Sequence, residues 1–105
     1  MDEPLLCFCT CPDGEVAAAL ARAMVEQGHA ACVNILPGVR SVYRWQGQVE
    51  SANEVMLWLK TVRRRYAALE EALRAAHPYE LPEIVAVSLT AGSEAYLRWI
   101  NDSLA

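Results

Sequence analysis

The residues ACVNILPGVRSVYRWQGQVESANEVMLWLKT, Ala31–Thr61, predict one long antiparallel hairpin, and the rest of the chain is organised around it. Its first arm is interrupted at Pro37-Gly38, where proline cannot donate to a strand ladder and glycine weakens a strand. This pair therefore predicts a β-bulge. Between the arms, Gln46-Gly47 predicts the turn, with glycine in a position that commonly requires a positive φ.

The predicted hairpin is too long for this chain to cover. Each arm spans roughly 40 Å at the ~3.3 Å rise of a strand, about twice the average strand length. A single domain of 105 residues cannot bury both faces of such an element. Tyr43 and Trp45 in its outer half, with Val42 on the other side, are apolar. The outer half therefore predicts a partner chain, with Trp45 at or near the subunit contact.

Composition sets further limits on the kind of protein. The length predicts one domain, residues 1–105, and the 54% hydrophobic content excludes disorder. No apolar run approaches the ~20 residues of a membrane helix, and the acidic start Met1–Pro4 is not expected to be a secretory signal. The net charge of −4 argues against nucleic acid and membrane as partners. The four cysteines are expected to be free thiols in a cytoplasmic chain.

The flanking patterns predict two more strands and three helices. The strands are Leu5–Thr10 and Ile84–Leu89, and the helices are 14–27, 64–76 and a last one after Ser93. The resulting order, β-α-β-β-α-β plus a terminal helix, is an α+β fold of the split β-α-β or ferredoxin-like plan. That plan places its main helices on one face of the sheet. Yet the strands Leu5–Thr10 and Ile84–Leu89 are apolar on both of their faces. A homo-oligomer that buries the open face is therefore expected.

Finer features of the elements can be predicted as well. Asp13 is expected to cap the first helix, and Gly28 to end it. We expect the last helix to carry Tyr96, Leu97, Ile100 and Leu104, His29 to be an exposed loop residue and Cys32 to lie in the core.

Motifs spread along nearly the whole chain resemble, in order and spacing, the CutA divalent-cation-tolerance proteins. The matching pieces are Cys9–Asp13, Ala31–Asn34, Pro37-Gly38, Ser41–Gly47, Glu50, Glu54, Lys60-Thr61, His77–Ile84 and Tyr96–Ile100. The resemblance implies a very stable cytoplasmic homotrimer of ferredoxin-like subunits, similar in architecture to the PII-type signalling trimers. It also implies a non-enzymatic link to the tolerance of copper and other divalent metals.

The resemblance further implies a copper site. In the family, the ligands are assigned to the cysteine before Thr-x-Pro-Asp and to two histidines ahead of Pro-Tyr. These positions are Cys9, Ala76 and His77 in this chain. One proposed donor is therefore an alanine, and Cys9 and His77 are the candidate metal ligands.

Three cysteines alternate along the first strand, at positions 7, 9 and 11. Alternate side chains of a strand start about 6.6 Å apart. Two sulfurs bound to one ion at a metal–sulfur distance of ~2.3 Å can be separated by at most ~4.6 Å. A straight strand is therefore not expected to present two of them to one ion. Buried small hydrophobes are the favoured interpretation, with Cys9 the best candidate for Cu(I).

The surroundings of His77 leave two alternatives open. It follows a helix end, where it could cap the last carbonyls or complement the helix dipole, or it could bind metal. Because Cys9 is placed within the sheet and His77 at a helix end, a single ion need not reach both in one subunit.

Six side chains could line an inter-subunit cleft: Glu50, Glu54, Lys60, Tyr79, Glu80 and Glu83. Their spacing contains no nucleophile with a base and an orienting group, and the chain has no glycine-rich phosphate motif. A metal-binding trimer is favoured. The alternatives are a PII-like trimeric sensor that binds a small molecule in inter-subunit clefts, and an enzyme of undescribed activity.

Overall fold

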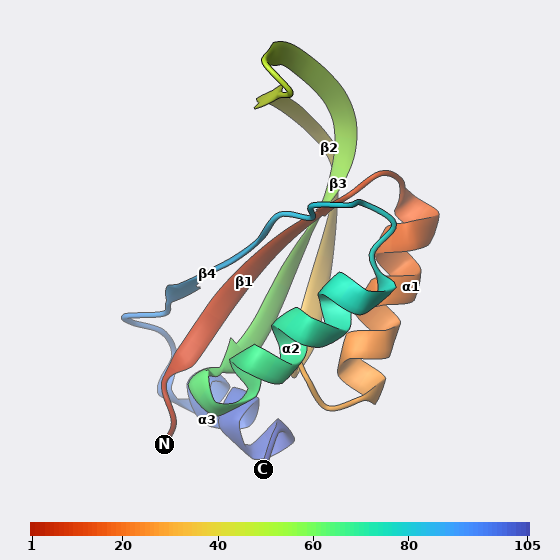
Figure 1. The fold of residues 1–105 in the computed structure, drawn as a ribbon. Coiled ribbons are helices and arrows are strands. Elements are labelled where there is room, and N and C mark those ends of the chain that lie inside the picture. Colours follow the sequence, from red (N-terminus) through yellow and green to blue (C-terminus); the bar gives the residue numbers. More distant parts are fainter.

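The computed structural model describes all of residues 1–105 and contains four strands and three helices (Figure 1). In chain order these are β1 (Pro4–Cys11), α1 (Gly14–Glu26), β2 (Cys32–Trp45), β3 (Gln48–Val62), α2 (Arg63–Ala76), β4 (Ile84–Ser88) and α3 (Glu94–Ser103). The strands form one antiparallel sheet in the order β2-β3-β1-β4. The predicted α+β, ferredoxin-like order with an extra terminal helix is confirmed.

The long hairpin is formed by β2 and β3, of 14 and 15 residues. Its pairing register shifts between Leu36 and Val39, which confirms the predicted bulge. At the turn, Gln46 and Gly47 both have positive φ, 50° and 80°, as the turns that match the twist of a hairpin require. The outer half projects beyond the helices (Figure 1) and extends the molecule to 44 Å in its longest dimension.

The main core lies between the sheet and the helices α1 and α2, which cover one of its faces (Figure 1). Alternate residues of β1 and β3 point into this layer and pack against leucines and small residues of the two helices. The fully buried residues of this core are Cys7, Cys9, Cys11, Ala17, Leu57, Leu59, Leu69 and Leu73. Helix α1 begins where the sequence predicts, because the Asp13 carboxylate accepts a 2.8 Å hydrogen bond from the Val16 N–H.

The opposite face of the sheet is covered only at one end. There α3 packs Ile100 and Leu104 against Val62. Farther along the same face the apolar side chains remain exposed, and Val85 and Val87 keep about half of their surface in solvent, 53% and 51%. The prediction that the first and last strands, β1 and β4, carry apolar residues on both faces is therefore confirmed, and one of these faces is open within a single chain.

Two local expectations were wrong. His29 is half-buried, because Thr61 of β3 donates a 2.7 Å hydrogen bond to its carbonyl and holds the loop against the sheet. Cys32 is only half-buried, because β2 is an edge strand with a neighbour on one side. None of the three helices combines the length and the apolar character needed to span a bilayer.

Candidate metal centre

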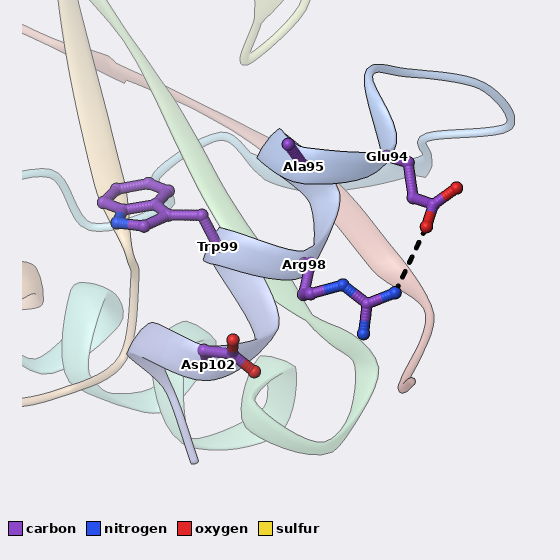
Figure 2. A pocket seen from close by; sticks show the side chains of 5 residues that line it. All are labelled: Glu94, Ala95, Arg98, Trp99 and Asp102. Atoms are coloured by element: carbon purple, nitrogen blue, oxygen red, sulfur yellow. Dashed lines mark hydrogen bonds and ion pairs between the residues drawn. The ribbon is translucent and has the colours of Figure 1, made fainter.

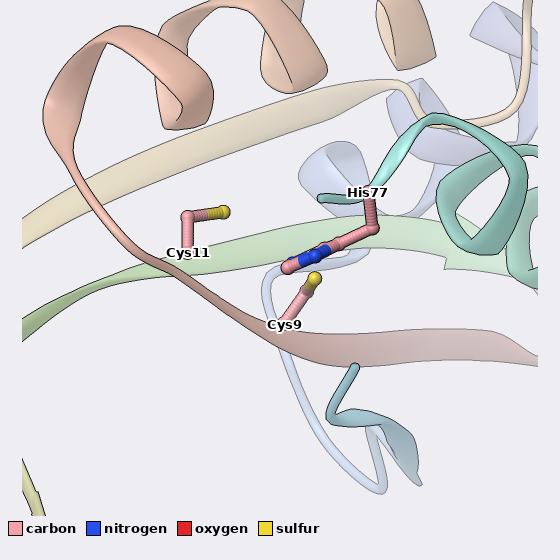
Figure 3. A group of neighbouring side chains, drawn as sticks. All are labelled: Cys9, Cys11 and His77. Carbon is pink, nitrogen blue, oxygen red and sulfur yellow. The ribbon is translucent and has the colours of Figure 1, made fainter. Parts of the chain in front are cut away.

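Three potential metal donors converge where β1 ends and α2 ends (Figure 3). The sulfur atoms of Cys9 and Cys11 and a ring nitrogen of His77 all lie within 4.8 Å of one another. Both cysteines are fully buried, and His77 is 8% exposed. The two ligands predicted from the sequence, Cys9 and His77, are therefore neighbours within one chain. A single ion could reach both of them in one subunit, which the sequence left open.

The expected separation of the strand sulfurs was also wrong for one pair. The pleat of a strand fixes where alternate side chains start, but rotation about the Cα–Cβ bond can bring their sulfur atoms together. Cys11 is the last residue of β1, where the chain turns toward α1, and its sulfur points toward the same ring as that of Cys9 (Figure 3). Cys7 lies outside this group, so the three cysteines do not form a single centre.

His77 is held by two hydrogen bonds from its ring. Its Nε2 lies 2.8 Å from the carbonyl oxygen of Thr10, and its Nδ1 accepts a 3.1 Å hydrogen bond from the Tyr79 N–H. Because Nδ1 uses its lone pair to accept, the neutral ring carries its proton on Nε2 and donates it to Thr10. The side chain therefore links β1 to the connector after α2, rather than capping the carbonyls of the helix.

Burial controls the protonation of the strand thiols. Burial, reinforced by the Glu70 carboxylate, raises the pKa of the Cys7 thiol to about 12. The pKa of Cys9 is also raised, first by a hydrogen bond with the Cys11 sulfur and then by burial. The same hydrogen bond lowers the pKa of Cys11. A metal ion that bound here would have to displace the thiol protons.

The donor set fits copper better than zinc. Thiolate sulfur selects soft ions such as Cu(I), and imidazole also binds copper. A structural zinc site almost always has four ligands, whereas three donors gather here. Ala76 is exposed on the last turn of α2, so the second family histidine position contributes no donor. Cys11 is a donor that was not among the ligands predicted from the sequence. Its spacing from Cys9, C-x-C, could have indicated it, because this spacing places both cysteines on one face of the strand.

A groove of about 920 Å³ lies beside this cluster, between the outer hairpin and the connector after α2. It brings together four of the six predicted cleft residues: Glu54, Tyr79, Glu80 and Glu83. The Tyr79 hydroxyl donates a 2.7 Å hydrogen bond to the buried Glu54 carboxylate. Burial and this bond raise the pKa of Tyr79. Glu50 and Lys60 lie outside the groove lining.

A second hollow, of about 500 Å³, lies on the outside of α3 (Figure 2). Its lining consists of Glu94, Ala95, Arg98, Trp99 and Asp102, all from the same helix. Its charged side chains include an exposed pair one helical turn apart, with 3.3 Å between the Arg98 guanidinium and the Glu94 carboxylate. A pair of this kind is typical of a solvated helix face, and the hollow shows no convergence of groups from different elements.

Comparison with known proteins shows extensive similarity. Residues 5–103 match the family described as CutA1 divalent ion tolerance protein. The divalent-cation tolerance protein CutA of Thermus thermophilus is 46% identical over 94 residues, which cover 90% of this chain and 91% of that protein. The CutA protein of Mus musculus is 43% identical over 90% of this chain, which spans 53% of that longer relative. The crystal structure of CutA from Xylella fastidiosa superposes with a TM-score of 0.95 at 43% identity, covering 98% of this chain and 99% of that one.

Proposed function

The chain belongs to the CutA1 divalent ion tolerance family, and from this membership we propose that it is a non-enzymatic protein of divalent-cation tolerance that binds copper. One observation carries the proposal: the sulfurs of Cys9 and Cys11 and the imidazole of His77 converge within 4.8 Å. A bound copper ion would take its donors from this cluster, and the protein would hold the ion rather than react with it.

Binding, rather than catalysis, suits the burial of the cluster. Cys9 and Cys11 have no solvent-exposed surface, and His77 has 8%. A site this buried can hold an ion, whereas an organic molecule in the neighbouring groove would not reach the sulfurs. The thiols must lose their protons when an ion binds, so burial also makes loading slow and pH-dependent.

Isothermal titration of the reduced, metal-free protein tests this function. We expect one copper ion per chain, a large loss of affinity in Cys9→Ser, and wild-type binding in Cys7→Ser. The Cys7 variant is the matched control, because it makes the same change on the same face of β1 outside the cluster. Tight binding that Cys9→Ser leaves unchanged would place the copper elsewhere and contradict the proposal.

We further propose a cytoplasmic homotrimer. The open face of the sheet exposes apolar residues on β3 and β4, among them Trp58, Val85 and Val87. The sheet also ends in two free edges, β2 and β4. Two different edges that pair head to tail between copies generate a closed ring, and this would bury the apolar face. A reducing compartment suits a chain whose four cysteines are all free.

The groove beside the cluster favours a second candidate, a PII-like trimeric sensor of a small molecule. Its volume of about 920 Å³ is within the range of ligand pockets. The residues that line the groove include the aromatic Tyr43, Trp45 and Tyr79 and the acidic Glu54. Thermal stabilisation by a nucleotide, and none by copper, would support this candidate against the metal-binding one.

A further inference from the structure

We propose that this chain binds copper as Cu(I), between the thiolates of Cys9 and Cys11, and that His77 covers the ion without ligating it. The inference rests on the proposed function, which assigns copper to this cluster, and adds the oxidation state and the ligand set. It makes Cys11 a ligand and removes His77 from the set.

The two sulfurs are arranged for one ion. Cys9 and Cys11 lie two residues apart on the helix-covered face of β1, and both are fully buried. Their sulfurs lie within 4.8 Å of each other, so one ion with metal–sulfur distances of ~2.3 Å can be shared between them with small side-chain rotations. An ion between the two sulfurs therefore needs little rearrangement of either cysteine.

The hydrogen bonds of His77 leave it no free lone pair. A neutral imidazole has one donor and one acceptor nitrogen, and in His77 the donor faces the Thr10 carbonyl while the acceptor receives the Tyr79 N–H. Ligation would require the ring to give up one of these bonds. The backbone group left behind would then be unpaired, at a cost of about 1–3 kcal/mol if it stays buried. Two sulfurs bind the ion without this loss.

The same surroundings select Cu(I) over the divalent ions. Thiolates favour this soft ion, which readily accepts only two ligands. Zn(II) needs about four ligands, and no oxygen donor completes the three-donor group. The cysteines belong to the same buried cluster as Leu57 and Leu73, and the Thr10 carbonyl beside them is already hydrogen-bonded to His77. The site therefore offers few replacements for the water ligands of a hydrated divalent ion.

His77 lies on the solvent side of the sulfurs, because it alone of the three has any exposed surface. An incoming ion therefore passes its ring, which two hydrogen bonds hold in place. In this arrangement His77 slows entry and exit of the ion but contributes little to the affinity. A ligand would have the opposite effect, since its removal would lower the affinity.

Anaerobic competition separates these roles. Reduced, metal-free protein is titrated with Cu(I) in the presence of bicinchoninate, a coloured Cu(I) chelator, and the rate of transfer from the chelator is followed by stopped flow. Wild type is compared with Cys9→Ser, Cys11→Ser, His77→Gln and His77→Ala, with Cys7→Ser as matched control. Circular dichroism establishes that each variant is folded, and His77→Gln keeps a donor and an acceptor in case His77→Ala is not. Copper K-edge absorption reports the neighbours of the bound ion.

We expect each of the two cysteine variants to lose more than about 100-fold in affinity, beyond the usual effect of an outer-shell partner. Cys7→Ser should match wild type. His77→Gln should stay within about 10-fold of the wild-type affinity, the lower limit for an outer-shell partner, and load at least as fast. His77→Ala, where folded, should load faster. The absorption edge of wild type and His77→Gln should show the same sulfur-only shell.

Other results would overturn the inference in distinguishable ways. If His77→Gln loses as much affinity as Cys9→Ser while Cys11→Ser is unaffected, the ligands are Cys9 and His77; the proposed function then stands and this inference fails. Zn(II) binding as tight as that of Cu(I), with the same dependence on both cysteines, would overturn the choice of ion. Absence of copper binding, or binding that none of these substitutions changes, would overturn both this inference and the proposed function.

Discussion

The hydroxyl of Tyr79 donates a 2.7 Å hydrogen bond to the carboxylate of Glu54, and this bond joins the connector after α2 to the long hairpin. The backbone N–H of Tyr79 also donates to the ring of His77. One residue of the connector therefore contacts both the groove and the metal cluster. Its two bonds fix the connector against the sheet at the point where the three metal donors meet.

Tyr79→Phe should lower the free energy of unfolding by about 1–3 kcal/mol, because it leaves the buried Glu54 carboxylate without its protein donor. The measurement is the urea midpoint at fixed protein concentration. Tyr43→Phe is the matched control, since it removes a hydroxyl from the same groove without breaking a hydrogen bond within the protein. Equal midpoints for the two variants would show that the Tyr79–Glu54 bond is not stabilising.

Stability should fall at alkaline pH. Burial raises the pKa of Tyr66 from 10.0 to about 12 in the folded chain. The folded state therefore holds this proton more tightly than the unfolded state. The resulting stabilisation is fully present below pH 10 and is lost as the pH rises through 12. Urea midpoints between pH 8 and 12 should decline, and less steeply in Tyr66→Phe. An equally steep decline in that variant would contradict the assignment to Tyr66.

The cysteines should differ sharply in reactivity. Cys7, Cys9 and Cys11 are fully buried, and burial raises the pKa of Cys7 to about 12, so little thiolate is present or accessible. Cys32 is half-buried on the edge strand. In the reduced native protein at neutral pH, iodoacetamide should modify Cys32 first, and Cys32→Ser should abolish this early phase. Mass spectrometry identifies the modified residue, and early modification of Cys9 would contradict the burial of the cluster.

Self-association should depend on the open face of the sheet. Sedimentation at micromolar concentration should give three times the chain mass of 11.6 kDa. Trp58→Glu places a charge on this face and should shift the mass toward the monomer, because a buried unpaired charge is costly. Arg22→Glu on the exposed side of α1 is the control. A monomeric wild-type chain would exclude the trimer.

Much of the fold could be predicted from local patterns. The hairpin, its bulge between Leu36 and Val39 and its turn at Gln46-Gly47 follow from backbone preferences of proline and glycine, which depend little on distant contacts. The cap of α1 at Asp13 is equally local. The burial of Cys32 could not be predicted in this way, because it depends on β2 lying at the edge of the sheet.

The metal cluster was predicted only in part. Cys9 and His77 were named from a family resemblance, whereas their proximity depends on how the end of α2 packs on β1. Cys11 was not predicted as a ligand, because the spacing of residues along a strand does not fix the distance between their sulfur atoms. Side-chain rotation changes that distance. The two hydrogen bonds of the His77 ring involve Thr10 and Tyr79, which no sequence pattern connects.

The position of the copper ion is tested most directly by a crystal structure of the reduced, Cu(I)-loaded protein. Anomalous diffraction is recorded on both sides of the copper edge. We expect one strong anomalous peak per chain between the sulfurs of Cys9 and Cys11, where the donors already lie within 4.8 Å. A peak at the groove carboxylates or at His29, with none at these sulfurs, would contradict it.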